Sequence, residues 1–194
     1  MKLKTITPIV IVAVIATFLS FRFATSSNSY EMGDSLVKWR DFHSALKESQ
    51  KTGKKIFMDV YTTWCGPCRK LNSVTFADPV IADILNNDFI PVKFDAESDD
   101  DILYLGKTYK NQNPGAGPRR STHDFAAAIA ASNGRLVYPT MIIFDENQQK
   151  IDFNPAITGF RTPKDMEPLL TYVGKDHFRK QSWEDFMSTF KSKL

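Results

Sequence analysis

Short apolar runs alternate with amphipathic segments along most of the chain. The apolar runs are rich in β-branched and aromatic side chains and are bounded by turn-forming residues, a pattern that predicts buried strands. The expected strands are residues 56–61, 90–94, 138–145 and 150–154, the last continuing toward Ile157. Residues 146–149 (Glu-Asn-Gln-Gln) supply the turn before the last of these strands.

Helices are predicted before, between and after these strands. One apolar series at helical spacing begins at Leu36 and is ended by Gly53. Two later helices start with a capping side chain followed by proline, which is typical of a helix N-terminus. The further helices are expected directly after the cysteines, from Pro79, over residues 101–109, over 124–131, from Pro163 to about Tyr172, and from Ser182. Strands alternating with helices predict an α/β fold with a central mixed sheet.

The connection over residues 107–136 is unusually long. Its first part, residues 113–120, has loop chemistry, and its alanine-rich second part is predicted to be helical. Connections of this length are commonly functional or mobile, although the sequence favours a surface excursion without a role.

The N-terminal residues 1–24 differ from the rest of the chain. Two lysines precede an uncharged, apolar stretch at residues 5–21, which is the layout of an export signal. The stretch is also close to the length that spans a bilayer, and no clear cleavage signature follows it, so a signal peptide and a membrane anchor both stay open. Residues 25–35 are small and polar and suit a linker, which leaves residues 36–194 for the domain.

The formal net charge of +3 comes from this leader. Lys2, Lys4 and Arg22 are its three cations, and without them the chain holds 22 basic and 22 acidic residues. A balanced domain without a basic stripe gives no electrostatic reason to bind nucleic acid. With an export signal, we expect the domain in the periplasm or cell envelope, soluble or anchored to the inner membrane.

The chain has two cysteines, Cys65 and Cys68, separated by Gly66 and Pro67. A structural disulfide there would close so small a loop that it would stabilise little. A zinc site lacks a second cysteine pair, and the three histidines are scattered. The sequence therefore predicts a redox-active pair that needs no metal or other cofactor.

The position of the pair supports this chemistry. A cysteine at the start of a helix, just after a strand, has free backbone N–H groups beside its sulfur, and these favour the thiolate. The thiolate is the nucleophile of disulfide exchange, and a second cysteine one turn later can resolve the mixed disulfide. Gly66 and Pro67 permit the tight junction, because Pro67 lacks an N–H where the helix has no partner for one.

Residues 64–68, Trp-Cys-Gly-Pro-Cys, are identical to the active-site motif of thioredoxins, and the chain resembles this superfamily over roughly residues 39–173. Asp59 lies six positions before Cys65, where thioredoxins have a buried aspartate. Lys93 and Pro139 stand where the family has the partner of that aspartate and a cis-proline. The resemblance implies a thioredoxin fold with a helical insertion at 107–136 and an extra C-terminal helix within 174–194.

The resemblance also implies roles for individual residues. Cys65 attacks the substrate disulfide, Cys68 releases the reduced product, and Asp59 is the base for Cys68. Lys93 either pairs with Asp59 or is an ordinary exposed strand lysine. The substrate-binding surface comprises Trp64, Gly66, Pro67, Tyr138, Pro139 and Thr140. Tyr138 departs from the smaller aliphatic residue usual before this proline in cytosolic thioredoxins.

The pairing of glycine with proline between the cysteines is associated with reductants, and thioredoxin lies near roughly −270 mV against about −120 mV for the strongest periplasmic oxidant. We therefore expect an exported enzyme that reduces or exchanges disulfides of envelope proteins and receives electrons from a membrane thiol carrier. Its partners are proteins with thiols or disulfides. A disulfide oxidase or isomerase is the alternative enzyme, and a thioredoxin-fold module that only binds or assembles partners is the alternative outside enzymes.

Overall fold

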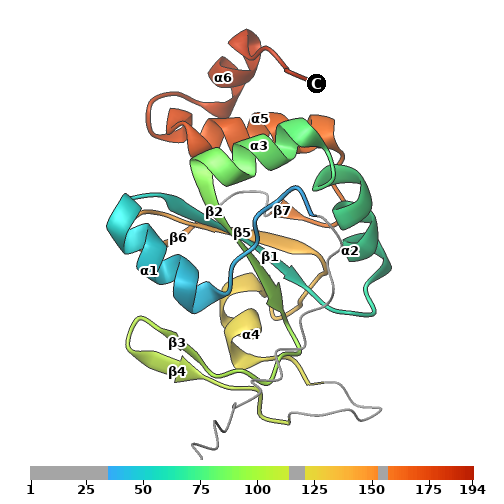
Figure 1. Ribbon diagram of the computed structural model, residues 1–194, viewed down its shortest axis with the longest axis vertical. Helices are drawn as coiled ribbons and strands as arrows, with labels where there is room; N and C mark the ends of the chain where they lie inside the picture. Colours follow the sequence, from blue (N-terminus) through green and yellow to red (C-terminus); the bar gives the residue numbers. More distant parts are fainter. Residues whose placement is uncertain (1–34, 114–120, 153–156) are drawn as a thin grey trace, which may run out of the picture. The chain divides into compact units, whose positions relative to one another are not determined.

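The computed structural model describes residues 35–113, 121–152 and 157–194, and within them helices pack on both faces of a mixed sheet (Figure 1). The strands are β1 (Lys55–Tyr61), β2 (Phe89–Asp95), β3 (Ile102–Tyr104), β4 (Lys107–Tyr109), β5 (Thr140–Phe144), β6 (Lys150–Ile151) and β7 (Ile157–Thr158). The helices are α1 (Phe42–Thr52), α2 (Gly66–Lys70), α3 (Pro79–Asp88), α4 (Asp124–Ala130), α5 (Pro163–Gly174) and α6 (Trp183–Thr189). The predicted leader and all but the last residue of the predicted linker lie outside the described residues.

The main sheet has the strand order β2-β1-β5-β6, and β7 also pairs with β5. Strand β1 runs parallel to β2 and antiparallel to β5. This central position buries the first six of its seven residues. In the register, Asp59 stands opposite Lys93 on one side and Met141 on the other. Two of the residues predicted to form the site are therefore direct neighbours across a strand pair.

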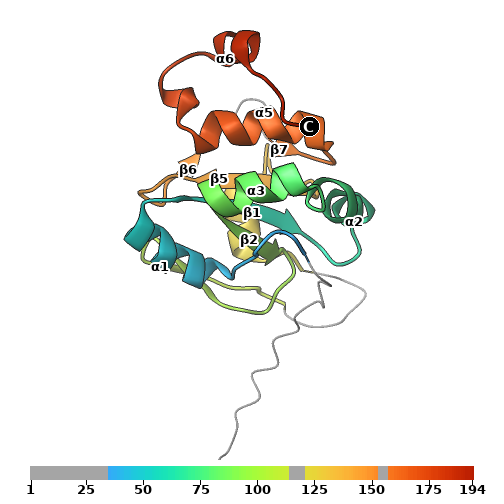
Figure 2. The ribbon, with the colours of Figure 1, turned by 45° about the horizontal axis from the view of Figure 1, so that its top comes forward.

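Alternation along β1 divides the core into two clusters of side chains, one on each face of the sheet, and helices lie on both of these faces (Figure 2). Met58 and Val60 face a layer that also holds Phe42 of α1 and Phe125 of α4. Phe57 faces the other layer, which is formed mainly by side chains from α3 and α5. Because side chains alternate between the faces of a strand, Asp59 projects to the same face as Phe57. Leu71, three residues after Cys68, belongs to this same layer.

The capping signals read from the sequence are present. The side chain of Asp78 accepts hydrogen bonds from the backbone N–H groups of Val80 and Ile81, and Thr162 forms a capping box with Asp165. The first helix, however, begins at Phe42 rather than near Leu36, since Asp41 caps it. The preceding residues are not helical, and Arg40 forms a parallel bridge with Val92.

The helix predicted over residues 101–109 is wrong, because this segment is the hairpin β3–β4. Ile102 and Tyr104 are buried whereas Leu103 between them is 54% exposed, which is the period of a strand. The turn is made by Leu105 and Gly106, whose φ angles are 49° and 76°. Two positive φ angles are what a tight hairpin turn requires, and leucine is an unusual residue there. The apolar residues of this segment fit a helical spacing, but the turn at Leu105 and Gly106 divides them between two strands.

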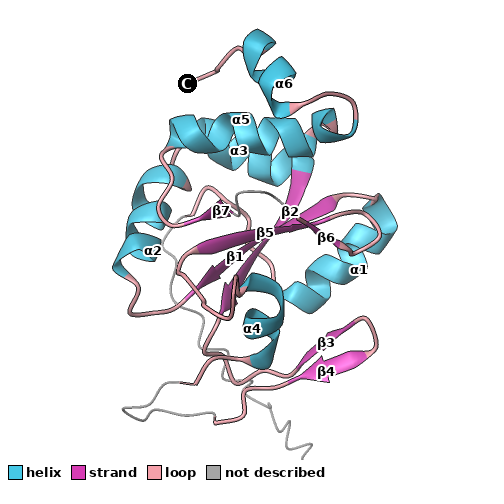
Figure 3. Ribbon diagram, turned by 180° about the vertical axis from the view of Figure 1, so that it is seen from behind, coloured by secondary structure: helices cyan, strands magenta, loops and turns pink. Residues whose placement is uncertain are grey.

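The predicted insertion and C-terminal extension contain the helices expected of them. Helix α4 lies within residues 107–136 and packs beside the hairpin, where Phe125 contacts the rings of Tyr104 and Tyr109 (Figure 3). Helix α6 follows the Ser182 cap. Residues 114–120, and 153–156 between β6 and β7, lie outside the described residues. In the described ranges, no helix is long and apolar enough to cross a membrane.

Candidate functional site

The two cysteines lie between the end of β1 and the first turn of α2 and form a disulfide with a Cα–Cα distance of 5.3 Å. Cys65 is the N-cap residue of α2, and its Sγ accepts a hydrogen bond of 3.1 Å from the backbone N–H of Cys68. Pro67 lies in the first turn of the helix, as the sequence predicts. An N–H group aimed at sulfur stabilises negative charge on it, so this geometry favours Cys65 as the thiolate once the pair is reduced.

Asp59 is completely buried, and its Oδ2 lies 3.1 Å from Lys93 Nζ. The pairing that the resemblance implied is therefore present, and an exposed strand lysine is not what the structure has. Among the described residues, neither carboxylate oxygen of Asp59 has a hydrogen-bond partner, so the contact with Lys93 is an ion pair. Burial raises the pKa of Asp59, and the Lys93 ammonium offsets part of that rise. A carboxyl group with a raised pKa is suited to accept and return a proton near neutral pH.

Lys93 has further neighbours that sequence reasoning missed. Its Nζ donates a hydrogen bond to Asn72 Oδ1 on the π-helical turn Leu71–Thr75, which continues α2. Three aromatic rings surround the same ammonium group at distances suited to cation–π contacts, which extend to about 6 Å from the ring centroid. They belong to Tyr61 at 4.8 Å, Trp39 at 5.2 Å and Phe76 at 5.8 Å. The sequence does hold one indication of Asn72 as a neighbour of the site: it lies four residues after Cys68, which places both residues on one face of a helix.

Trp64 and Tyr138 form an aromatic pair beside the cysteines. Their ring centroids are 6.0 Å apart with an interplanar angle of 88°. Trp64 is 49% exposed, and its Nε1 donates to both carboxylate oxygens of Glu97, at 3.0 and 3.1 Å. Burial and the acidic groups of Glu97 and Asp95 raise the pKa of Tyr138, while Thr122 lowers it. Glu97 is a neighbour of the site that the sequence motif does not include.

The peptide bond between Tyr138 and Pro139 is cis, as the resemblance implied. Pro139 is buried, and its carbonyl oxygen accepts from the Gly159 N–H at 2.8 Å. The Thr140 hydroxyl turns back to donate to the Val137 carbonyl at 2.6 Å. Gly66 and Pro67 are exposed. Of the predicted substrate-binding residues, Thr140 thus braces the loop with its side chain, whereas Trp64, Gly66 and Pro67 flank the cysteines in sequence and Tyr138 packs against Trp64.

The neck of the insertion is tied to the loop that carries Glu97. Asn111 Nδ2 donates to the backbone carbonyls of Glu97, Ser98 and Ser121 at 3.2–3.3 Å. The His123 N–H donates to the Ala96 carbonyl at 2.7 Å. The insertion is therefore attached at its base to the loop that holds Trp64 in place.

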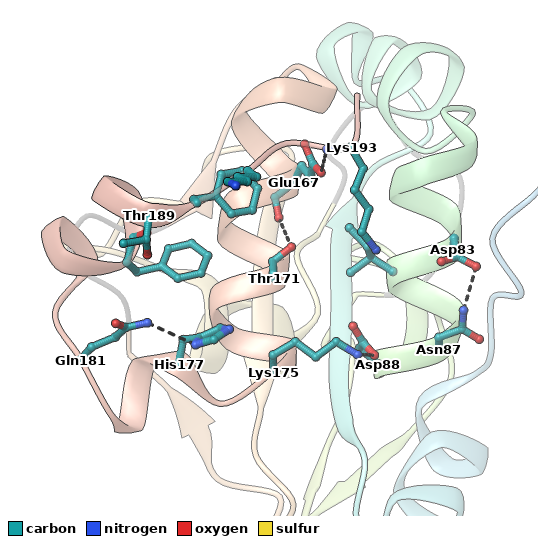
Figure 4. Close-up of a pocket in the computed structure, with 14 residues that line it drawn as sticks. Asp83, Asn87, Asp88, Glu167, Thr171, Lys175, His177, Gln181, Thr189 and Lys193 are labelled. Atoms are coloured by element: carbon teal, nitrogen blue, oxygen red, sulfur yellow. Dashed lines mark hydrogen bonds and ion pairs between the residues drawn. The ribbon is translucent and has the colours of Figure 1, made fainter.

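A cavity of about 330 Å³ lies between α3, α5 and the C-terminal residues (Figure 4). None of the predicted site residues lines it. Its polar side chains pair with one another or with neighbouring backbone, as Asp83 does with Asn87, Asp88 with Lys175, and His177 with Gln181. The cavity therefore presents no unpaired buried group that would select a ligand. In the parts of the chain that the structure describes, no group of three or more His, Cys, Asp or Glu side chains could hold a metal ion.

Residues 42–174 match the family model of the thioredoxin-like domain. No curated protein matches the chain. Its fold is similar to that of a thioredoxin from Thermus thermophilus, with a TM-score of 0.50, 14% identity, and coverage of 71% of this chain and 86% of that one. A Bacteroides thetaiotaomicron protein proposed to be a disulphide-isomerase has a TM-score of 0.48, 22% identity, and coverage of 76% and 98%. A thioredoxin-fold protein from Helicobacter pylori has a TM-score of 0.46, 12% identity, and coverage of 70% and 79%.

Proposed function

Because the chain belongs to the thioredoxin-like domain family, we propose that it reduces or exchanges disulfide bonds in proteins of the cell envelope. The chain is a thiol-disulfide oxidoreductase of this fold, with Cys65 and Cys68 as its redox pair. The observation that carries the mechanism is the hydrogen bond from the Cys68 N–H to Cys65 Sγ. It supports Cys65 as the attacking sulfur, because this donor stabilises the thiolate at that position.

The reaction proceeds in two exchange steps. The Cys65 thiolate attacks one sulfur of the substrate disulfide, a bond forms between those two sulfurs, and the second substrate sulfur leaves as a thiolate. The Cys68 thiolate then attacks Cys65 Sγ and releases the first substrate sulfur as a thiolate. The substrate gains two electrons, and the protein ends with the Cys65–Cys68 disulfide that the structure contains.

Asp59 is the proposed proton acceptor for Cys68. A buried thiol resists ionisation, and Cys68 is 3% exposed, so the second step needs a base. Asp59 is a buried carboxylate on the same sheet face that α2 and its continuation cover. Its raised pKa makes it a stronger base than an exposed aspartate. Lys93 keeps the carboxylate form accessible by pairing with it.

The substrate-binding surface is proposed to be formed mainly by Trp64, Tyr138 and Pro139. The two rings form a partly exposed aromatic surface at the cysteine pair. An extended polypeptide is proposed to bind here through the backbone of Tyr138, in the manner of an added strand. Gly66 and Pro67 complete the exposed rim.

The envelope setting rests on the sequence of residues 1–24, and the reducing direction rests on the Gly-Pro pair between the cysteines. A reductant in an oxidising compartment needs recharging, and a dithiol protein of the membrane is the class of donor that would return two electrons. An oxidase or isomerase would use the same two cysteines in another direction. A redox potential near that of the strong oxidants would support that reading instead.

Reduction of insulin disulfides by dithiothreitol, with and without the protein, tests the enzymatic proposal. We expect wild type to accelerate the reaction, Cys65→Ser to abolish the acceleration, and Ser73→Ala, at an exposed position of the following turn, to retain it. Equal rates for wild type and Cys65→Ser would support a binding module instead.

Expression of the full chain with Cys68→Ser tests the envelope setting. Substrates then accumulate as mixed disulfides on Cys65, because the resolving sulfur is missing. Captured envelope proteins would support the proposal, and capture of cytoplasmic proteins alone would contradict it. Fractionation of the same cells shows whether the leader is cleaved.

A further inference from the structure

The surroundings of Lys93 contain more than the ion pair with Asp59. The ammonium group has two oxygen partners within the described residues, Asp59 Oδ2 on β1 and Asn72 Oδ1 on the turn after α2. The lysine side chain is only 10% exposed. A buried ammonium group needs acceptors for its protons, so both oxygens contribute to holding the charge at this place.

The three rings around the ammonium group limit where it can move. The rings of Tyr61, Trp39 and Phe76 lie around Nζ, with centroids 4.8–5.8 Å from it. Trp39 and Phe76 also contact each other edge to face, with centroids 5.0 Å apart. Aromatic faces attract a cation but offer it no acceptor for a directed hydrogen bond. The position of the Lys93 ammonium is therefore set by its hydrogen bond to Asn72 and its ion pair with Asp59.

Asn72 connects this cluster to the cysteine helix. It lies four residues after Cys68, one helical turn further along the segment that begins at the redox pair. Its partner Lys93 is 21 residues away in sequence, on β2. The amide oxygen thus joins the element that carries the resolving cysteine to the strand that carries the cation.

We propose that Asn72 is a positioning residue, which holds the Lys93 ammonium against the Asp59 carboxylate and so keeps the proton acceptor of Cys68 ionisable. The inference rests on the proposed role of Asp59 and extends it to a residue outside the cysteine motif. Without the Asn72 oxygen, the ammonium loses one of its two oxygen partners and is no longer held against the carboxylate. Asp59 then keeps its desolvation penalty and loses the charge that offsets it.

The charged and titratable groups around Asp59 are few, which makes the effect measurable. Lys93 on β2 is the charged group that acts on its pKa, and the Tyr61 ring lies over the Lys93 ammonium. Met141 of β5 is its neutral register partner. On the α2 side, Cys65 and Cys68 do not titrate while they form the disulfide. The oxidised protein therefore isolates the influence of Lys93 and Asn72 on Asp59.

The test is a titration of the Asp59 carboxyl carbon by NMR in the oxidised protein from the full chain, labelled with ¹³C-aspartate and assigned with Asp59→Asn. We expect Asn72→Ala to raise the pKa of Asp59 by more than half of the rise that Lys93→Met causes. The double variant is expected to match Lys93→Met alone, because Asn72 acts through Lys93. Asn72→Leu, which is similar in size and lacks the oxygen, replaces Asn72→Ala if that variant does not fold.

Ser73→Ala is the matched control, since Ser73 lies next to Asn72 and is exposed, and its hydroxyl donates to the Lys70 carbonyl. An unchanged or lowered pKa of Asp59 in folded Asn72→Ala, or an additional rise in the double variant, would overturn the inference. The rate of insulin-disulfide reduction by the same samples tests the proposed function separately. An inactive wild-type protein would refute that function, yet the NMR titration would still report whether Asn72 positions Lys93.

Discussion

Asp59 and Lys93 are register partners in the parallel pair of β1 and β2, and their charged groups meet 3.1 Å apart inside the protein. The two residues lie on different strands, each between apolar neighbours, so only the pairing of β1 with β2 brings their charged groups together. The pair combines a full desolvation of the carboxylate with a cation that compensates only part of it. The balance of these two effects leads to the first prediction.

Asp59→Asn is expected to change how stability depends on pH. Burial raises the folded-state pKa of Asp59 above its ordinary value of 3.8, so the folded protein retains a proton that the unfolded chain has lost. This contribution is fully present below about pH 3.8 and disappears as the pH rises through the folded-state pKa. The unfolding free energy of Asp59→Asn relative to wild type should therefore increase with pH, by about 1.4 kcal/mol for each unit between the two pKa values.

Urea unfolding of the oxidised proteins from pH 3 to pH 9, on the order of one unit per step, measures this difference. Asp99→Asn, at an exposed loop position, is the control and should show no such trend. A difference between Asp59→Asn and wild type that stays constant with pH would contradict the prediction.

In the reduced protein, Cys65 is expected to react with iodoacetamide before Cys68. Both side chains are 3% exposed, so access does not separate them, whereas the Cys68 N–H at 3.1 Å stabilises the thiolate of Cys65. At neutral pH we expect a preference of roughly tenfold or more, because a capped thiol is commonly a unit or more easier to ionise. Peptide mass spectrometry after short alkylation checks the order. Preferential labelling of Cys68 would assign the roles of the two sulfurs the other way round.

Trp64→Ala is expected to impair reduction of protein disulfides more than reduction of a small aromatic disulfide. The indole is held by Glu97 and packs against Tyr138, so it forms a rigid apolar surface that a polypeptide covers and a small molecule does not need. A loss of about tenfold in kcat/KM for insulin corresponds to about 1.4 kcal/mol of binding. Trp183→Ala, which removes an exposed tryptophan from α6, is the control. Equal losses with both substrates would place Trp64 in the chemical step instead.

Glu167 is expected to secure the C-terminal residues. It is 1% exposed in α5, and its carboxylate accepts hydrogen bonds from the Lys193 N–H at 2.6 Å and from the Ser192 hydroxyl. Glu167→Ala should lower the unfolding free energy by about 1–3 kcal/mol, because two donors lose their buried acceptor. Chemical denaturation measures the loss, and Glu184→Ala on the exposed face of α6 is the control. Deleting residues 191–194 should add little further loss in the Glu167→Ala background, whereas full additivity would mean that the two are not coupled.

Local patterns identified most of the elements and the chemistry. The caps Asp78 and Thr162, the strand periods, and the sequence from Trp64 to Cys68 act over a few residues, so they can be read without knowing the fold. Burial of Asp59 was also predictable, because a lone acidic residue inside an apolar run has no exposed face on a central strand. The hairpin β3–β4 escaped prediction because Leu105 adopts a positive φ that its side chain does not favour.

By itself, the sequence determined the redox pair, the strand that delivers it and the identity of the buried carboxylate. The tertiary structure alone decided what surrounds them, since these contacts join residues that are distant along the chain. Asn72 meets Lys93 across 21 positions, Trp64 meets Glu97 across 33, and Glu167 meets Lys193 across 26. Periodicity and capping reflect interactions within one or two turns, whereas these partners are brought together only when the helices pack on the sheet. The redox cysteines can therefore be identified from the sequence, whereas the residues that surround them can be identified only from the tertiary structure.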